Sequence, residues 1–417
     1  MDPVSAPLTI NGDRLIRRIN ELGQIGRDQN GMLTRLAASD ADMKGRDALV
    51  GWMKSIDLDV RIDRIGNLFG IWPPSDTSLC PVMIGSHIDT VVDAGIYDGC
   101  YGVLSGLEVI ETLRESGFVP PRPVAVAAFT GEEGVRFAPD MIGSLAYVGG
   151  CSADQALATV GTDGATLGNE LDRIGYAGDM APGALRPHCY VELHIEQGPV
   201  LEHEGFQIGV VEGVQGISWQ SVTIDGEANH AGTTPMKLRR DAGLAAARIV
   251  TFLRDYVSRS NAPTVATVGT MRFAPNAINV IPSHASLTVD LRDPDESRLQ
   301  AVENAFHDCL SRIEKEERTT IKVERLARFE PVAFDRRVVA TIQRVAEEMG
   351  LAWKLMASGA GHDAQMIARI APAGMIFVPS IGGISHSPHE FTPARHLVTG
   401  ANALLRVVCK LLGGTFD

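Results

Sequence analysis

The fold of this chain is decided by two stretches of its sequence, PVMIGSHIDT at residues 81–90 and VAVAAFTGEE at residues 124–133. Each stretch is a short apolar run that ends in polar residues. Between them, leucine and isoleucine recur at helical spacing from Leu104 to Leu113. An apolar strand, a helix and a second apolar strand predict a buried sheet with parallel elements. In such sheets, ligand-binding groups collect where the strands end.

The sequence pattern changes from about residue 216. The elements that we expect there are, in order, a strand in ISWQSVTIDG (217–226), a helix from Leu238 to Tyr256, strands in VATVGTMRF (265–273) and SLTVDLRD (286–293), a helix over 296–315 and a strand in TTIKVERLAR (319–328). The order βαββαβ predicts a small α+β domain inserted into the larger one. The apolar segment MIFVPSI (375–381) then resumes the first pattern.

The fold class that follows from these patterns is α/β. We expect a mixed, largely parallel sheet with helices on both faces in a discontinuous main domain, residues 1–215 and 330–417. Residues 216–329 are expected to form the inserted α+β domain. A chain of 417 residues is too long for one ordinary core, so its length favours the same division.

Composition and charge exclude several classes of protein. Hydrophobic residues make up 45% and charged residues 21% of the chain, which is typical of an ordered globular protein. No apolar run approaches the roughly 20 residues that cross a bilayer, so we expect no membrane partner. The net charge of −13 repels a phosphate backbone, so we expect no nucleic-acid partner either.

The cysteines and the N-terminal segment bear on location. The six cysteines are scattered without a CxxC pair, which indicates reduced thiols. Residues 1–23 have no apolar core behind a basic start, so they do not resemble a secretory signal. We therefore expect a cytoplasmic protein.

Carboxylates and histidines gather at the ends of the expected strands. His87 and Asp89 stand two residues apart, and a carboxylate beside a histidine is a usual way of orienting a metal ligand. Asp98 follows in YDGCYG at the start of the next helix, and a carboxylate can bridge two cations. Glu132 and Glu133 follow the second strand, where adjacent acids repel each other unless cations lie nearby. One of them can bind a metal while the other handles a proton of the attacking water.

Two further histidines complete the candidate set, one in HIEQGP and one in GISHSPHE. The candidate ligands, expected at five strand ends of one sheet, are His87, Asp98, Glu133, His194 and His386. Nitrogen and oxygen donors without sulfur suit zinc, manganese, cobalt or nickel. Taken singly, a histidine is more often a surface or satisfied core residue, paired glutamates are more often a solvated loop, and Asp98 could be a helix cap. Their recurrence at strand ends favours a metal site.

Longer stretches of the chain resemble a known family. They are GNLFGIW (66–72), GSHIDT (85–90), GEEGVRF (131–137), HIEQGPVLE (194–202), NHAGTTPM (229–236), SGAGHDA (358–364) and GISHSPHE (383–390). Together they resemble the M20-type dinuclear metallohydrolases and, within them, the hydantoinase/carbamoylase amidase group. That group contains N-carbamoyl-L-amino acid hydrolases, β-ureidopropionases, allantoate amidohydrolases and ureidoglycolate amidohydrolases.

The resemblance implies a role for each candidate ligand. Asp98 would bridge two metal ions. His87 and His194 would complete one metal site. Glu133 and His386 would complete the other. The resemblance thus implies two divalent ions per subunit, with zinc favoured over manganese, cobalt and nickel.

The same resemblance assigns the groups beside the metals. Glu132 would be the general base that takes a proton from the attacking water and passes it to the leaving nitrogen. Asp89 would orient His87. Gln197, three residues after His194, would lie close to the substrate or the metals.

The inserted domain would be a lid and dimerisation domain, in which His230, Asn279 and Arg292 match the family's lid residues. Arg292 offers a planar fork suited to a substrate carboxylate. His230 and Asn279 would polarise the scissile carbonyl or hold the substrate, reaching in from the partner subunit of a homodimer. Without the resemblance, NHAGTTP could be only a turn and LRD only an exposed strand end.

Two further features concern the substrate. SGAGHDA places the backbone amides of Gly359 and Gly361 within reach of a carboxylate, with His362 nearby as support. The stretch TVVDAGIYDG has Asp93 where many family members carry an Asn- or Thr-rich segment with two glycines. We expect this additional acid near the metals to shift substrate preference.

The function that the resemblance implies is metal-dependent hydrolysis of the linear ureido C–N bond of an N-carbamoyl amino acid, which releases the amino acid, ammonia and carbon dioxide. Allantoate and ureidoglycolate remain alternative substrates, because they too combine a carboxylate with a ureido group. A metalloexopeptidase is disfavoured by HIEQGPVLE and SGAGHDA. A non-catalytic binding relative is disfavoured by the intact glutamate pair and the five ligands.

Overall fold

The computed structural model describes residues 8–73, 79–260 and 262–413. Residues 1–7, with which the segment considered as a secretory signal begins, lie outside the described residues. Among the residues that are described, no helix is both long and apolar enough to span a membrane.

The chain divides into two compact units. The first consists of Met1–Glu212 and Ala333–Asp417, and the second is Gly213–Val332. The expected inserted domain, 216–329, falls inside the second unit. Each unit has its own sheet and its own apolar core.

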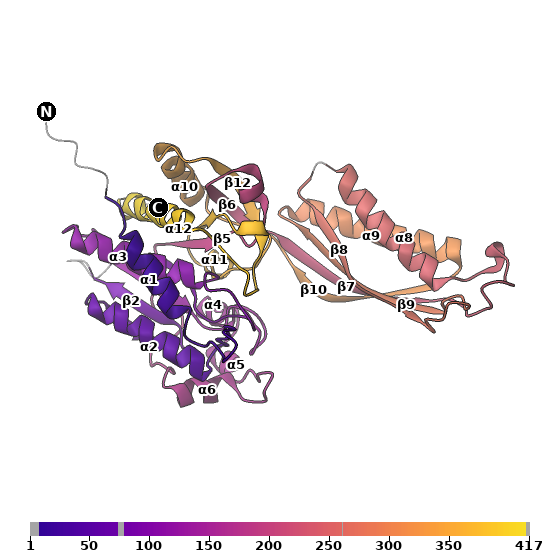
Figure 1. Cartoon of the computed structure of the whole chain (residues 1–417), viewed down its shortest axis with the longest axis horizontal. Coiled ribbons are helices and arrows are strands. Elements are labelled where there is room, and N and C mark those ends of the chain that lie inside the picture. Colours follow the sequence, from indigo (N-terminus) through magenta and orange to yellow (C-terminus); the bar gives the residue numbers. More distant parts are fainter. Residues whose placement is uncertain (1–7, 74–78, 261, 414–417) are drawn as a thin grey trace. The chain divides into compact units, whose positions relative to one another are not determined.

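The first unit surrounds its sheet with helices (Figure 1). These helices are α1 (Gly12–Leu22), α2 (Asp40–Ser55), α3 (Cys100–Glu115), α4 (Ile142–Tyr147), α5 (Ala153–Leu157), α6 (Leu167–Ile174), α7 (Val200–Glu204), α10 (Arg336–Glu348), α11 (Asp363–Ile367) and α12 (Ala394–Leu412), with the 3-10 helix η2 (Ile381–Gly383). The strands are β1 (Asp59–Ile62), β2 (Leu68–Trp72), β3 (Val82–His87), β4 (Val124–Phe129), β5 (Cys189–Ile195), β6 (Ile208–Val214), β11 (Val332–Ala333), β12 (Trp353–Ser358) and β13 (Ala373–Val378).

These strands form one mixed sheet. Over the described residues it has nine strands in the order β1-β2-β4-β3-β5-β13-β6-β11, with β12 paired to β6. β3 runs parallel to β4 and β5, and β13 runs parallel to β5, whereas the outer pairs β1–β2, β2–β4 and β6–β13 are antiparallel. The register aligns the carboxyl ends of the parallel strands, because His87 is opposite Phe129 and Phe377 is opposite His194.

Every residue of the four central strands β3, β4, β5 and β13 is buried. Helix α3 approaches one face of this sheet so closely that it needs glycine: a Cβ at Gly102 would lie 2.4 Å from the carbonyl oxygen of Leu193. On the other face, the ring of Phe129 packs against Tyr147 of α4 and Tyr190 of β5, with centroids 5.5 and 6.2 Å apart. Helices therefore cover both faces of the sheet, as the apolar strands predicted.

The second unit is a four-stranded antiparallel sheet with two helices. Its elements are β7 (Gly216–Asp225), the 3-10 helix η1 (Met236–Leu238), α8 (Ala242–Arg259), β8 (Val265–Ala274), β9 (His284–Asp293), α9 (Glu296–Glu317) and β10 (Thr320–Phe329). The strand order over the described residues is β10-β7-β9-β8. Alternate residues of β9 are buried beneath α8 and α9 (Figure 1), which is the pattern of a sheet covered on one face. The expected order βαββαβ is confirmed.

Candidate functional site

The carboxyl ends of the parallel strands bring the predicted ligands together. His87 is the last residue of β3 and His194 lies one residue before the end of β5. Glu133 lies in the loop after β4, and His386 in the loop after β13. Asp98 belongs to the connection between β3 and α3, so the ligands come from four strand ends and the prediction of five was wrong. Two of them, His87 and Asp98, follow the same strand.

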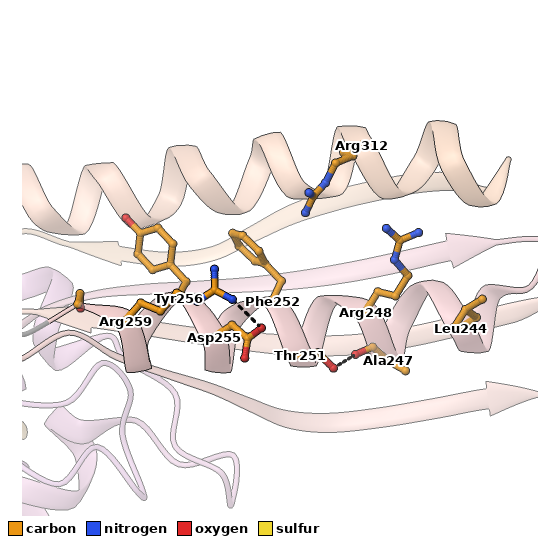
Figure 2. A pocket seen from close by; sticks show the side chains of 10 residues that line it. Leu244, Ala247, Arg248, Thr251, Phe252, Asp255, Tyr256, Arg259 and Arg312 are labelled. Atoms are coloured by element: carbon orange, nitrogen blue, oxygen red, sulfur yellow. Dashed lines mark hydrogen bonds and ion pairs between the residues drawn. The ribbon is translucent and has the colours of Figure 1, made fainter.

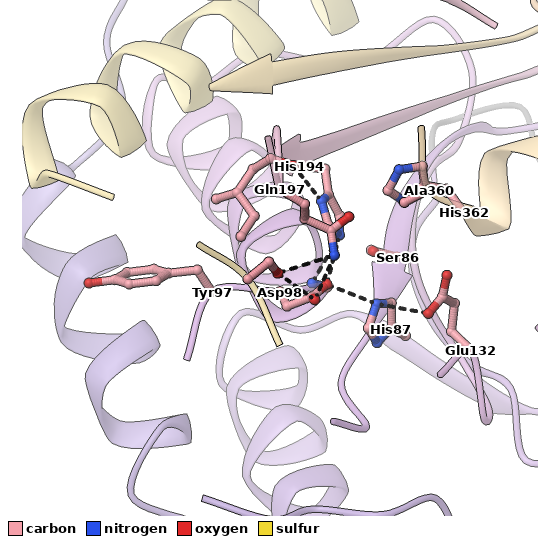
Figure 3. Close-up of polar contacts among 12 residues, drawn as sticks. Ser86, His87, Tyr97, Asp98, Glu132, His194, Gln197, Ala360 and His362 are labelled. Atoms are coloured by element: carbon pink, nitrogen blue, oxygen red, sulfur yellow. Dashed lines mark hydrogen bonds and ion pairs between the residues drawn. The ribbon is translucent and has the colours of Figure 1, made fainter. Parts of the chain in front are cut away.

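The first cluster consists of His87, Asp98 and His194, which point toward one another in Figure 3. Their donor atoms all lie within 4.8 Å of one another. The Nε2 atom of His87 is 3.6 Å from Asp98 Oδ1, and that of His194 is 3.1 Å from the same oxygen. All three side chains are buried.

The second cluster uses the other oxygen of Asp98. His386 Nε2 lies 3.2 Å from Asp98 Oδ2 and 3.4 Å from Glu133 Oε2. The second carboxylate oxygen of Glu133 is buried and has no hydrogen-bond partner within the described chain. The carboxylate of Asp98 thus serves two clusters, because one of its oxygens faces the first and the other faces the second. Each cluster has oxygen and nitrogen atoms that can bind a cation.

The imidazole rings are oriented for metal binding. A backbone carbonyl only accepts hydrogen bonds, so Nδ1 of His87 donates to the carbonyl of Asp89 (3.0 Å) and Nδ1 of His194 donates to that of Ile195 (2.8 Å). The Gly99 amide donates to His194 Nε2 at 3.1 Å, which identifies that nitrogen as an acceptor. In each ring Nδ1 is thus occupied by a carbonyl and Nε2 faces Asp98, so Nε2 is the nitrogen that can bind a metal ion.

Asp89 acts differently from the expectation. Its carboxylate oxygen lies 3.9 Å from His87 Nδ1, and it is the backbone carbonyl of Asp89 that accepts from the ring. The carboxylate instead accepts the backbone amides of Gly131, Glu132 and Glu133, at 3.2, 3.3 and 3.4 Å. Asp89 therefore fixes both the histidine and the loop that carries the two glutamates.

Glu132 lies beside the first cluster but supplies no donor atom to either of the two clusters. Its Oε2 is 3.4 Å from His87 Nε2. Burial raises the pKa of Glu132 well above its ordinary value; His87 opposes this shift and Glu133 adds to it. Burial, together with the charge of Asp98, raises the pKa of Glu133 to about 8. Divalent cations would remove this penalty, so the nitrogen and oxygen donors present here fit such ions.

A buried glutamate that the sequence did not suggest holds the shared carboxylate in place. Oε1 of Glu390 accepts the backbone amides of Tyr97 and Asp98, at 3.0 and 3.2 Å. Its other oxygen accepts a hydrogen bond from Ser385, whose hydroxyl also lies 3.3 Å from Asp98 Oδ2. The signal for Glu390 was its place in GISHSPHE, four residues after His386.

Gln197 lies at the second cluster, as expected for a residue near the metals. Its Nε2 donates to Asp98 Oδ2 at 2.8 Å, and its Oε1 is buried without a partner in the described structure. Both Gln197 and His386 have positive φ angles, 56° and 53°. Such backbone strain in residues other than glycine costs about 1–3 kcal/mol each and is concentrated at functional sites.

His362 supports His194 from behind the first cluster. The two rings pack edge to face with centroids 4.6 Å apart, and His362 Nε2 lies 2.9 Å from the hydroxyl of Ser358. Burial lowers the pKa of His362 well below its ordinary value, so the ring is neutral. Gly361 and His362 line the pocket over the clusters, whereas Gly359, proposed for a substrate carboxylate, is not among its lining residues.

Glu192 also approaches His194 and His362, but its oxygens are occupied by hydrogen bonds. They accept from the Ser86 hydroxyl (2.7 Å), the Tyr190 hydroxyl (3.2 Å) and the Ala364 amide (2.8 Å). Glu192 therefore ties β3, β5 and α11 together beneath the site. The signal that the sequence offers for Glu192 is an acid inside the otherwise apolar run YVEL.

The pocket over the clusters has a volume of about 120 Å³. Its lining residues are Asp98, Glu132, Glu133, Asp140, Gln197, Ala360, Gly361, His362 and His386. Asp93 is not one of them: it lies on an exposed turn with its amide bonded to Thr34. The additional acid at this site is Asp140, which the sequence did not single out.

The second unit places its three predicted residues at two separate ends. His230 and Asn279 are exposed neighbours, joined by an amide–carbonyl bond from Ala231 to Asn279 of 2.9 Å. Arg292 lies at the other end of β9, where Asp290 holds its guanidinium through Nε (3.0 Å) and Nη2 (2.8 Å). His284, near the first pair, and Arg292 are eight residue steps apart along β9, which corresponds to about 27 Å. Within one subunit these residues cannot surround one small molecule.

The most spacious groove of those described is elsewhere in the second unit. Figure 2 shows it on α8, facing α9, and its volume is about 790 Å³. None of the predicted residues lines it. Arg248 there is paired with Glu316 and Glu317, and Arg259 with Asp255, so its charges are largely balanced within the unit. We therefore place the functional site at the clusters around Asp98.

Comparison with known proteins finds relatives over nearly the whole chain. The family model described as Peptidase family M20/M25/M40 matches residues 83–410, which include all the residues of both clusters. An N-carbamoyl-L-amino-acid amidohydrolase from Rhizobium meliloti is 38% identical over 96% of this chain and 96% of its own length. A ureidoglycolate hydrolase from Oryza sativa subsp. japonica is 36% identical over 98% of this chain and 86% of its own.

The solved structures include a chain of the same architecture. An amidase of the hydantoinase/carbamoylase family from Burkholderia multivorans superimposes with a TM-score of 0.96 at 40% sequence identity. The superposition covers 98% of this chain and 100% of that one. Both units of the present chain therefore have counterparts in that structure.

Proposed function

The chain belongs to the peptidase family M20/M25/M40, and from this premise we propose that it is a metal-dependent amidohydrolase that cleaves the ureido C–N bond of an N-carbamoyl amino acid. The observation that carries the proposal is the shared carboxylate of Asp98 between two donor clusters, with Glu132 beside them and outside both. The products would be the amino acid, ammonia and carbon dioxide.

The two clusters divide the metal-binding work. His87, His194 and Asp98 would hold one divalent ion. Asp98, Glu133 and His386 would hold the other. Such ions acidify an attacking water and polarise the carbonyl that it attacks. Zinc is the ion we favour, with manganese, cobalt and nickel also suited to these donors.

Glu132 is the group that we assign as general base. It is buried, lines the pocket and is held by a backbone that Asp89 fixes. Its carboxylate takes a proton from the attacking water as the C–O bond forms, and gives it to the leaving nitrogen as the C–N bond breaks. Its Oε2 lies 3.4 Å from Nε2 of His87, whose ring is held in place by its bond to the Asp89 carbonyl.

The second unit supplies the substrate-binding groups in this proposal. Arg292 binds the substrate carboxylate through its planar fork. His230 and Asn279 lie too far from Arg292 along β9 to act on the same molecule, so we propose that they serve the active site of a partner subunit in a homodimer. The polar pair at the exposed end of the unit supports this assignment.

Two other substrates share the chemistry that this site recognises. Ureidoglycolate is favoured as a second candidate by the similarity to the rice ureidoglycolate hydrolase, and allantoate by its own carboxylate and ureido groups. A metalloexopeptidase would use the same metal clusters on a peptide bond. The six cysteines, all free in the structure, support a reducing, cytoplasmic compartment.

The experiment that tests the proposal measures ammonia release from N-carbamoyl amino acids, allantoate and ureidoglycolate, and amino-acid release from a dipeptide, with zinc, manganese, cobalt or nickel supplied. Glu132→Gln is expected to lower kcat by about 10³-fold while the content of bound metal stays the same. Turnover of the dipeptide alone would contradict the ureido assignment. Near-normal turnover by Glu132→Gln would contradict the role of the base.

A further inference from the structure

Besides Glu132, the pocket over the clusters contains one more carboxylate that neither cluster uses. Asp140 lines it together with Glu132, Glu133 and His386. It belongs to the loop between β4 and α4, on the same connection as the two glutamates. Asp140 is exposed and, like Glu132, contributes no donor atom to either cluster.

The backbone fixes the place of Asp140. The amide of the next residue, Met141, donates to the carbonyl oxygen of Glu132 at 2.8 Å. At the start of the loop, Gly134 has a φ of 66°, and a Cβ there would lie 2.8 Å from the backbone nitrogen of Asp140. The loop is therefore closed tightly on itself and bonded to the residue that we assign as the base. Asp140 keeps its position without help from its own side chain.

The charge of Asp140 has no counterpart. Among the described residues, none but its own backbone amide hydrogen-bonds to its carboxylate, and none forms an ion pair with it. By contrast, His386 contacts Asp98 and Glu133, and His87 contacts Glu132. Once the clusters hold cations, those three carboxylates are balanced as well. Asp140 remains a carboxylate on the pocket wall that no described side chain pairs with.

Building on the proposed function, we propose that Asp140 selects the side chain of the substrate: it admits neutral groups that donate hydrogen bonds and rejects a second carboxylate. A carboxamide or a second ureido group can donate an N–H to the Asp140 oxygens. A carboxylate at the same place is repelled by them. Asp140 is thus a specificity residue, separate from the groups that carry out the hydrolysis.

The matched substrates for a test are N-carbamoyl-L-asparagine and N-carbamoyl-L-aspartate, which have nearly the same shape and differ in charge. The experiment measures kcat/KM for both with the metal-loaded enzyme. We expect the wild type to favour the asparagine compound by on the order of tenfold or more. Asp140→Asn and Asp140→Ser are both expected to bring this ratio close to one.

A control variant removes the same charge elsewhere. Asp172 lies exposed on α6 and does not line the pocket, so Asp172→Asn is expected to leave the ratio at the wild-type value. A wild-type ratio near one overturns the inference, and so does a ratio that both Asp140 variants leave unchanged. An equal effect of Asp172→Asn also overturns it, because net charge would then be the cause.

The outcome also separates this inference from the function on which it rests. If the wild type hydrolyses neither these two compounds nor any other ureido substrate of the panel, the proposed function fails. If it hydrolyses them without discriminating between the two, only the role of Asp140 fails. Should both Asp140 variants misfold, the wild-type ratio alone still decides, because a ratio near one refutes the proposal.

Discussion

Replacing Gly99 by alanine tests the geometry of both clusters at once. Gly99 follows Asp98 with a φ of 64°, in the left-handed region, which costs an L-amino acid about 1–2 kcal/mol. An alanine Cβ there would lie 2.4 Å from the ring of His87. Carbon atoms in contact are normally about 3.5 Å apart, so His87 or the Asp98 backbone has to move by about 1 Å.

This displacement separates donor atoms that must converge on one ion. Misplacing a group by about 1 Å costs on the order of 100-fold in rate. We therefore expect Gly99→Ala to lose about 100-fold in kcat, to bind less metal, and to lose about 1–2 kcal/mol of unfolding free energy. The assays are ammonia release, the metal content of the dialysed protein, and urea denaturation.

Gly117 provides the matched control. It follows the other end of α3 with a φ of 74°, and a Cβ there would meet nothing within 4 Å. Gly117→Ala therefore carries the backbone strain without the clash, and we expect it to lose stability but neither metal nor activity. The reasoning is refuted if Gly99→Ala matches Gly117→Ala in metal content and kcat.

Three other predictions follow from the site and its charges. Mixing Glu132→Gln with His230→Ala subunits should restore about a quarter of wild-type activity. Half of the dimers are then mixed, and each mixed dimer has one intact site out of two. No recovery of activity would place His230 in its own subunit's site. Arg292→Lys should raise KM for a carboxylate-bearing substrate by about tenfold, with less effect on kcat, and an unchanged KM would remove Arg292 from the substrate. Burial, aided by neighbouring acids, raises the pKa of Asp363 to about 8 and that of Glu390 to about 7. Above a pH of about 4, these two groups therefore bind more protons in the folded metal-free protein than in the unfolded chain. Its denaturation midpoint should then fall as pH rises from about 5 to 8, and a midpoint that rises over this range would contradict the assignment.

The central strands and the ligands could be predicted because both produce strong local patterns. β3, β4 and β13 are continuous apolar runs, and the polar residues that follow them are the ones that meet in space. Three strands beyond β13, namely β6, β11 and β12, escaped prediction. β11 has only two residues, and β12 is only partly buried, so neither leaves a continuous apolar run.

The residues that surround the ligands were harder to foresee. Glu390 and Asp140 lie in loops without periodicity, and their importance comes from contacts that no spacing reveals. The carboxylate of Asp89 was assigned to His87 because the two are close in sequence, whereas it turns toward the Gly131 amide. Likewise, His230 lies near one end of β9 and Arg292 near the other. This separation depends on how the chain folds around β9, which residue types alone do not set.

The bond between Glu390 and the Asp98 amide has a consequence for synthesis of the protein. The two residues are 292 positions apart, and the β13 strand that precedes His386 also forms late in the chain. A nascent chain therefore cannot assemble the second cluster, or fix the Asp98 backbone through Glu390, until nearly all of it has been synthesised. The second unit is a continuous segment, Gly213–Val332, and can fold earlier. The donor set of the second cluster is thus complete only in a nearly full-length chain.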